Sequence, residues 1–223
     1  MGRLSEFGSV SIPVDDTFVE GDLTIPTDGN ALVIFAHGSG SSRQSPRNKY
    51  VAEILNRSGI ATLLIDLLTV EEEVVDNETA ELRFNVDLLA SRLIAATDWA
   101  REQRNLSNLR LGYFGASTGA AAALVAAARR PQTVSAVVSR GGRLDLARDA
   151  LGEVAAPTLL IVGGYDRQVI ELNRQAAQMM RAPVEIIIIP GASHMFEEPG
   201  ALEQVALLAR QWFEEKLIRM QAA

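Results

Sequence analysis

The sequence predicts a three-layer α/β fold, with a mostly parallel β-sheet, helices on both of its faces and an antiparallel N-terminal edge. Three observations predict it. Short, continuously apolar runs recur along the 223 residues, and longer helical stretches separate them. Continuous apolar runs are expected of parallel strands, because such strands are buried on both faces. Residues 10–26 differ, since alternating segments broken by proline and glycine are typical of edge strands.

The elements follow in chain order. Val10 to Ile12 and Thr17 to Ile25 are expected to form the antiparallel pair. The other predicted strands are Ala31 to Ala36, Ile60 to Ile65, Leu109 to Phe114, Val134 to Val138, Thr158 to Val162 and Val184 to Ile189. The predicted helices are Ser45 to Arg57, Thr79 to Arg104, Thr118 to Ala128, Asp145 to Leu151, Val169 to Arg181 and Leu202 to Met220. With no internal repeat and no linker, residues 1–223 are expected to form one domain.

Two connections bear on function. Between Val138 and Thr158 the sequence has room for only a short helix, so we expect no large lid domain. The stretch Leu67 to Glu78 carries Glu71-Glu72-Glu73 and Asp76, and this run of charge predicts a solvated loop.

Composition excludes several classes of site. The formal net charge of -7 argues against a nucleic-acid partner, which normally requires a basic surface. The absence of cysteine excludes disulfides, thiolate metal sites and a thiol nucleophile. Only two histidines, in separate loops, and no glycine-rich phosphate fingerprint are present, so neither a metal nor another cofactor is expected.

The location follows from what the chain lacks. The N-terminal residues have no apolar signal core, and the apolar runs are far too short to span a bilayer. We therefore expect a cytoplasmic protein with no membrane partner. The oligomeric state has no signature in the sequence.

The pentapeptide Gly115-Ala116-Ser117-Thr118-Gly119 is the most informative motif. It lies between a predicted strand and an alanine-rich predicted helix, which is the context of a nucleophile elbow. In such an elbow a tight turn pushes the serine hydroxyl out above the sheet. The glycines are needed because a Cβ at either position would crowd the folded backbone. Ser117 is therefore the candidate nucleophile.

A serine hydroxyl needs a base, an acid that orients the base, and donors for the oxyanion. His194 directly follows the strand Val184 to Ile189, and the carboxyl ends of parallel strands are where catalytic groups gather. We assign His194 as the base. His37 lies in the glycine- and serine-rich loop after Ala36, where it is expected to brace the loop and not to act as a base.

Asp166 is the preferred acid, since it follows the strand Thr158 to Val162. The alternative for Asp166 is a cap of the helix beginning near Val169. Its rivals as acid are Asp66, interpreted as a helix or turn cap, and Asp145, interpreted as the N-cap of its short helix. The order Ser117, Asp166, His194 is the order of α/β-hydrolases.

The whole set of motifs resembles the α/β-hydrolase superfamily and, within it, the compact, lidless dienelactone-hydrolase-like branch. The matching segments are His37-Gly38-Ser39-Gly40, Gly115 to Gly119, Gly163-Gly164-Tyr165-Asp166 and Gly191-Ala192-Ser193-His194. Dienelactone hydrolases proper use a cysteine nucleophile, whereas this chain has Ser117. The resemblance thus implies a serine esterase that acts through an acyl-enzyme. The backbone N–H groups of Thr118 and Ser39 are expected to form the oxyanion hole.

Substrate contacts are predicted from the loops that follow strands. Gly40, Arg43 and Arg140 are candidates, because arginine suits the recognition of a carboxylate. Arg47 and Arg143 lie in the same two arginine clusters. The alternative for the arginines is pairing with Asp145, Asp149 or the acidic stretch. Without a lid, small esters with short acyl groups are the expected substrates.

Three readings of function remain open at this stage. The same machinery could cleave an amide, a thioester or a lactone, because specificity resides in contacts outside the triad. A non-catalytic scaffold that binds a ligand or partner is the third, since a fold does not imply an activity.

Overall fold

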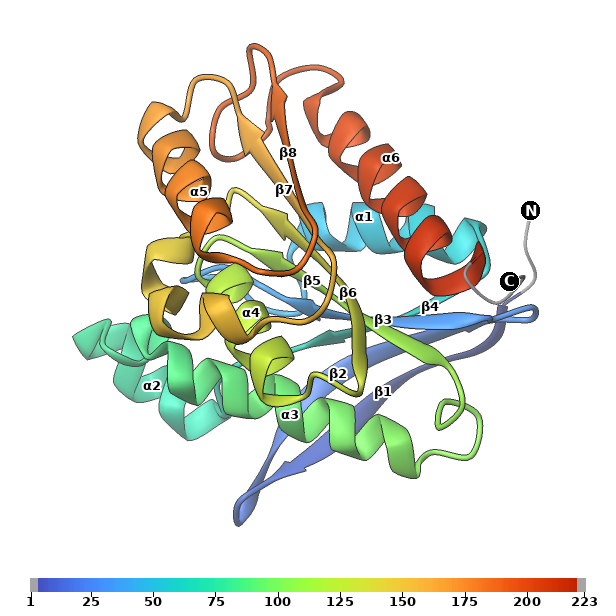
Figure 1. Cartoon of the computed structure of the whole chain (residues 1–223). Helices are drawn as coiled ribbons and strands as arrows, with labels where there is room; N and C mark the ends of the chain where they lie inside the picture. Colours follow the sequence, from blue (N-terminus) through green and yellow to red (C-terminus); the bar gives the residue numbers. More distant parts are fainter. Residues whose placement is uncertain (1–3, 220–223) are drawn as a thin grey trace.

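Residues 4–219 are described by the computed structural model, and their strands form one eight-stranded sheet in the order β1-β2-β4-β3-β5-β6-β7-β8 (Figure 1). The pairs β1–β2 and β2–β4 are antiparallel, and the other neighbouring strands are parallel. The bounds are β1 Leu4–Val14, β2 Thr17–Pro26, β3 Ala31–Ala36, β4 Ile60–Ile65, β5 Arg110–Ala116, β6 Val134–Arg140, β7 Thr158–Gly163 and β8 Val184–Ile189. The predicted fold class and antiparallel edge are confirmed.

Helices cover both faces of the sheet (Figure 1). The bounds are α1 Pro46–Arg57, α2 Val70–Thr79, η1 Leu82–Phe84, α3 Val86–Glu102, α4 Thr118–Arg129, η2 Leu144–Glu153, α5 Arg167–Met179, α6 Ala201–Phe213 and η3 Glu214–Ile218. Helices α1 and α6 enclose one core with the sheet, and α3, α4, α5 and η2 enclose the other. In α4 every residue from Thr118 to Ala127 is buried, and its alanines permit close packing against the strands.

The acidic stretch is mostly exposed to solvent, as predicted, but it was wrongly predicted as a loop, because most of it is helix α2. Thr69 is the N-cap, and its side chain accepts from Glu72 N while the Glu72 carboxylate accepts from Thr69 N. This reciprocal capping box satisfies two N–H groups that would otherwise lack partners. Asp76 is buried and accepts from Arg83, at 2.7 Å from Nε. Glu72 and Asp76 thus have structural contacts, whereas most other residues of α2 are exposed to solvent.

Other helix boundaries also differ from the prediction. The helix predicted from Thr79 begins only at Val86, because Ala80 adopts a left-handed conformation (φ 56°) that ends α2, and Asn85 caps α3. The segment predicted as Asp145 to Leu151 is the 3₁₀ helix η2, and Asp145 does not cap it. The last helix turns into a π-helical turn at Glu214, and the predicted end at Met220 lies outside the described residues.

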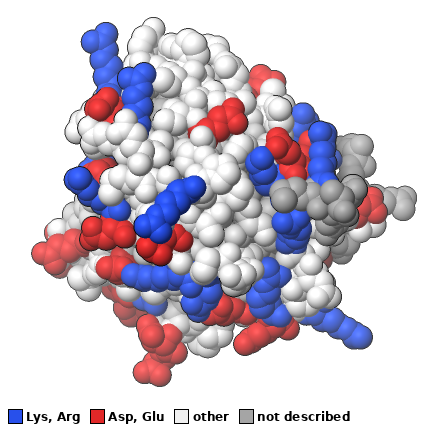
Figure 2. All heavy atoms as spheres, viewed as in Figure 1, with Lys and Arg blue, Asp and Glu red and all other residues white. Residues whose placement is uncertain are grey.

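The β6–β7 connection contains η2 and no inserted domain, as predicted. No helix in residues 4–219 is long and apolar enough to cross a membrane. Figure 2 shows acidic and basic side chains interspersed on one face, without a continuous basic surface.

Candidate active site

The carboxyl ends of four parallel strands meet at one edge of the sheet and carry the predicted site residues. His37 follows β3, Ser117 follows β5, Asp166 lies three residues beyond β7, and His194 lies in the loop after β8. Ala36 pairs with Gly115, and Gly163 pairs with Ile189, so the strand ends are aligned in register. The topology therefore brings these loops together.

Ser117 occupies a strained turn. Its φ is 52° and its ψ -118°, a conformation that residues other than glycine rarely adopt. The turn is held by hydrogen bonds from Ser117 N to Arg140 O (3.0 Å) and from Arg143 N to Ser117 O (3.1 Å). A Cβ at Gly119 would overlap the carbonyl oxygens of Ala36 and His37. This is the geometry expected of a nucleophile elbow.

The side chains of His194 and Asp166 are hydrogen-bonded to each other. His194 Nδ1 lies 2.6 Å from an Asp166 carboxylate oxygen, and Asp166 is the less exposed of the two. Since a carboxylate only accepts, Nδ1 carries the proton, and in the neutral imidazole Nε2 is then the acceptor. Asp166 stands at the N-cap position of α5, but its side chain makes no capping bond. Of the two roles predicted for Asp166, the structure supports the contact with histidine.

The two rival acids are occupied elsewhere. Asp66 accepts from the backbone N of Arg43 (2.7 Å) and pairs with the Arg43 guanidinium. Asp145 pairs with Arg143, at 2.8 Å from its Nη2. Within residues 4–219, neither carboxylate makes a hydrogen bond with a histidine.

Ser117 and His194 line one cavity of about 220 Å³, whose walls also include Ser39, Arg47 and Arg140. Pockets that take drug-sized ligands measure roughly 300–1,000 Å³. This cavity therefore suits a small ligand. Met195, Ser41 and Ser45 also line this cavity and were not predicted. The sequence could have indicated them, because Met195 is next to His194 and the two serines follow β3.

The expected oxyanion donors have free N–H groups. Among residues 4–219, the N–H of Ser39 and that of Thr118 make no hydrogen bond. A Cβ at Gly38 would stand only 3.3 Å from Ser117 Cβ, so this loop lies against the elbow. Thr118 is the first residue of α4, where the helix dipole favours negative charge.

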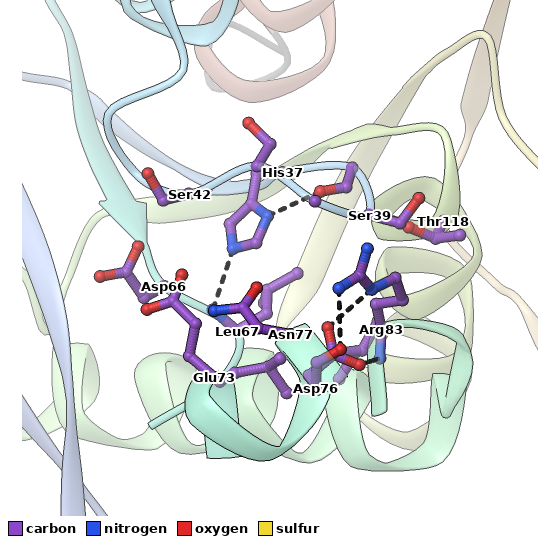
Figure 3. A pocket seen from close by; sticks show the side chains of 15 residues that line it. His37, Ser39, Ser42, Asp66, Leu67, Glu73, Asp76, Asn77, Arg83 and Thr118 are labelled. Atoms are coloured by element: carbon purple, nitrogen blue, oxygen red, sulfur yellow. Dashed lines mark hydrogen bonds and ion pairs between the residues drawn. The ribbon is translucent and has the colours of Figure 1, made fainter. Parts of the chain in front are cut away.

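His37 braces the same loop, as predicted. Leu67 N donates to His37 Nε2 (3.1 Å), and His37 Nδ1 lies 2.9 Å from Gly38 O, which can only accept (Figure 3). Both ring nitrogens are therefore committed, and the ring is the neutral Nδ1–H tautomer. Burial lowers the pKa of His37, and the Gly38 bond offsets part of that effect.

Because the His37 ring is buried and hydrogen-bonded in its neutral form, the free energy of unfolding depends on pH. The pKa of His37 is below 6.5 in the folded state and about 6.5 in the unfolded state, so the unfolded chain binds the proton first as pH falls. The contribution is complete above pH ~6.5 and is lost below it, by up to about 1.4 kcal/mol at pH ~5.5. Urea unfolding should show a steeper loss in the parent than in His37→Gln between those pH values. Equal losses would contradict the assignment.

A second cavity of about 80 Å³ shares Gly38, Ser39 and Ser41 with the first, and Figure 3 shows the side chains that line it. Gly40, predicted as a substrate contact, lines this cavity and not the one that contains Ser117. Two polar residues of the wall of this second cavity are bonded to each other, since Arg83 donates to Asp76 through Nε, Nη2 and its backbone N.

The predicted arginines separate into two groups. Arg43 does not line the Ser117 cavity; its guanidinium pairs with Asp22 and Asp66. Arg143 pairs with Asp145, as the alternative reading proposed. Arg140 does line the cavity, and Arg47 joins it from the first turn of α1.

The sheet order, the elbow and the loops at the carboxyl edge define an α/β-hydrolase fold. The family model described as "Dienelactone hydrolase family" matches residues 20–217, and the chain belongs to that family. A crystal structure of a dienelactone hydrolase from Anabaena variabilis is 58% identical, with a TM-score of 0.93, and the match covers 95% of this chain and 98% of that one. Est1E from Butyrivibrio proteoclasticus, at 17% identity, shares the fold, with a TM-score of 0.79 over 94% of this chain and 98% of that one.

A protein of Mycobacterium tuberculosis that carries the provisional name phosphoribosyl transferase is 57% identical over 199 residues. The match covers 89% of this chain but 44% of that protein. The chain therefore spans less than half the length of this relative, and the name describes a longer protein. The family model and the structural match agree on the family and the fold.

Proposed function

We propose that this protein hydrolyses small carboxylic esters through an acyl-enzyme on Ser117, with His194 as base and Asp166 as its orienting acid. One observation carries the proposal. The 2.6 Å contact between His194 and Asp166 leaves Nε2 as the free acceptor, and His194 shares its cavity with a serine held at φ 52°. A serine in such a turn beside an oriented imidazole meets the needs of nucleophilic catalysis.

The reaction proceeds in two halves. Ser117 Oγ attacks the ester carbonyl while His194 Nε2 takes its proton, and the carbonyl oxygen becomes an oxyanion held by Ser39 N–H and Thr118 N–H. The tetrahedral intermediate collapses, the C–O bond to the alcohol breaks, and the alcohol leaves with the proton from His194. Water then repeats the attack on the acyl-enzyme with His194 again as base, which releases the carboxylic acid and restores Ser117.

Substrate size follows from the cavity. About 220 Å³ shared among Ser117, His194 and two arginines leaves room for a short acyl group. Rates across a series of nitrophenyl esters should fall as the acyl chain lengthens.

A lactone is the second candidate substrate, because family membership favours it. The chemistry is the same, except that the leaving hydroxyl stays attached to the acyl group. Parallel rates on a lactone and on the open ester of the same acid would separate the two.

Labelling with a fluorophosphonate tests the nucleophile directly. The reagent forms a Ser Oγ–P bond with loss of fluoride, and only an activated serine reacts quickly. We expect one label, located at Ser117 by peptide mass spectrometry, and loss of ester hydrolysis in proportion to labelling. An unlabelled Ser117 in a protein that still hydrolyses esters would refute the mechanism, and absence of both would favour a binding scaffold.

A further inference from the structure

Asn173 is a fully buried amide in α5 that the proposed mechanism does not use. Its exposure is 0%, and it is the only polar residue among the buried residues of that helix. Its Nδ2 donates to Val169 O within α5 and to Gly142 O after β6, each at 2.8 Å. Its Oδ1 is buried and has no hydrogen-bond partner. The side chain therefore bridges α5 and the segment that follows β6.

Hydrogen-bond chemistry fixes the orientation of this amide. A carbonyl oxygen only accepts, so the amide nitrogen of Asn173 must face Val169 O and Gly142 O. The bridge consequently leaves Oδ1 unpaired, and a buried acceptor without a donor destabilises a fold. An unpaired buried group of this kind calls for an explanation, and we find it in the backbone that Asn173 holds.

The turn of residues 141–143 contacts both the candidate base and the candidate nucleophile. Arg143 N donates to Ser117 O at 3.1 Å. Gly141 has a φ of 56°, and a Cβ on it would stand 3.3 Å from His194 Cε1 and 3.4 Å from His194 Nδ1. The backbone of Gly141 therefore lies against the edge of the ring that bears the Nδ1 proton. A displacement of the 141–143 turn would reach the base and the elbow together.

Helix α5 carries the third member of the candidate triad. Asp166 stands at the N-cap position of α5, and Asn173 lies about two helical turns further along. The Asn173 bridge thus holds the helix that begins at the acid in a fixed position relative to the 141–143 turn, which supports the base. All three members of the candidate triad are linked through this one buried amide.

We propose that Asn173 is a positioning residue for the triad. Its amide fixes α5 to the 141–143 turn, and the turn keeps the His194 ring aligned between Asp166 and Ser117. Asn173 lines neither cavity, so it acts through the turn and not on a substrate. Without the bridge the turn gains freedom, and the ring spends less time in line with the carboxylate and the serine. The kinetic effect rests on the proposed function, whereas the alignment of the ring does not.

Two substitutions remove the bridge. Asn173→Thr is similar in size, and a threonine hydroxyl in a helix can still bond to the carbonyl four residues back, so only the bond to Gly142 is lost. Asn173→Leu removes both bonds and the unpaired Oδ1. In both variants kcat for a nitrophenyl acetate should fall on the order of 10- to 100-fold, because a misplacement of about 1 Å has effects of that size. KM should change little, since the cavity walls remain.

Thr97→Val is the matched control. Thr97 is also fully buried in a helix, and its hydroxyl bonds to Leu93 O in α3 and to the Tyr113 hydroxyl on β5. It lines neither cavity. Urea unfolding should show a loss of stability in Thr97→Val, while kcat stays at the parental value. A comparable fall of kcat in Thr97→Val would mean that any loosening of the core slows the reaction and would overturn the proposal. Parental kcat in both Asn173 variants would overturn it as well.

Proton NMR of the imidazole groups separates positioning from folding. His194 Nδ1–H is bonded to a carboxylate, and its signal should lie far downfield in the parent. In Asn173→Thr this signal should move upfield or broaden, whereas that of His37, bonded to Gly38 O, should stay unchanged. An unchanged His194 signal would overturn the proposal whatever happens to kcat. If the parent hydrolyses no ester, the proposed function fails, and the His194 signal still decides the role of Asn173.

Discussion

Replacing Ser117 by alanine is expected to reduce ester hydrolysis by on the order of 10⁴-fold or more, with the fold retained. Ser117 supplies the only atom that would become bonded to the acyl group. The cavity walls and the free N–H groups of Ser39 and Thr118 remain, so a small residual rate above that of water is expected. Steady-state kinetics on a nitrophenyl acetate measure the loss.

A glycine at the same position gives the complementary result. The φ of 52° and ψ of -118° at Ser117 strain any residue that has a Cβ, and glycine relieves this strain. Ser117→Gly should therefore be as inactive as Ser117→Ala, yet more stable than the alanine variant by on the order of 1 kcal/mol. Urea unfolding measures the difference between the two inactive proteins.

Ser91→Ala is the matched control. Ser91 is an exposed serine on α3 whose hydroxyl donates to Leu88 O, away from both cavities. It should keep parental activity. If Ser117→Ala also keeps it, the nucleophile lies elsewhere. If Ser117→Gly is markedly less stable than Ser117→Ala, the elbow is not strained as described.

Sequence patterns predicted the sheet well, because its parallel strands are buried on both faces. A run such as Ala31 to Ala36 needs no tertiary information to be recognised, and all six of its residues are buried in β3. The residues of the candidate triad could also be proposed from the sequence. Each member follows a strand, and the carboxyl ends of parallel strands meet at one edge. The order of the motifs along the chain was therefore enough to predict that these residues lie close together.

Helix α2 was missed although its start signal is in the sequence. Thr69 and Glu72 have the spacing of a capping box, but the neighbouring acidic residues suggested solvation. The burial of Asp76 depends on Arg83, which lies beyond the end of the helix. The run of charge correctly indicated an exposed segment, but it did not indicate the helix or the burial of Asp76.

The sequence did not show which of the candidate arginines are paired with carboxylates. Arg43 and Arg140 both follow strands and appeared equivalent as substrate contacts. Their difference is tertiary, because Arg43 meets Asp22 on β2 and Asp66 after β4, whereas Arg140 meets no carboxylate in the described chain. Ion pairs between residues more than twenty positions apart have no local signature. Only the structure separates a paired arginine from a free one.

Asp166→Asn is expected to lower kcat by on the order of 10⁴-fold, the size of the effect that the corresponding change has in trypsin. The reason is the tautomer. The Asp166 carboxylate accepts from His194 Nδ1–H and leaves Nε2 free for the serine proton. An asparagine that presents its amide N–H instead would favour the Nε2–H tautomer, which cannot act as base.

Two measurements show whether the tautomer is the cause. The chain has two histidines, so ¹⁵N spectra of labelled rings contain few signals, and His37 serves as an internal Nδ1–H reference. His194 should be protonated at Nδ1 in the parent and at Nε2 in Asp166→Asn, while His37 stays unchanged. Asp145→Asn is the control, since Asp145 pairs with Arg143 and contacts no histidine in the described structure. Loss of activity in Asp145→Asn with Asp166→Asn unaffected would reverse the assignment of the acid. Loss in Asp166→Asn without a change of tautomer would instead mean that the carboxylate acts chiefly by stabilising the protonated imidazole.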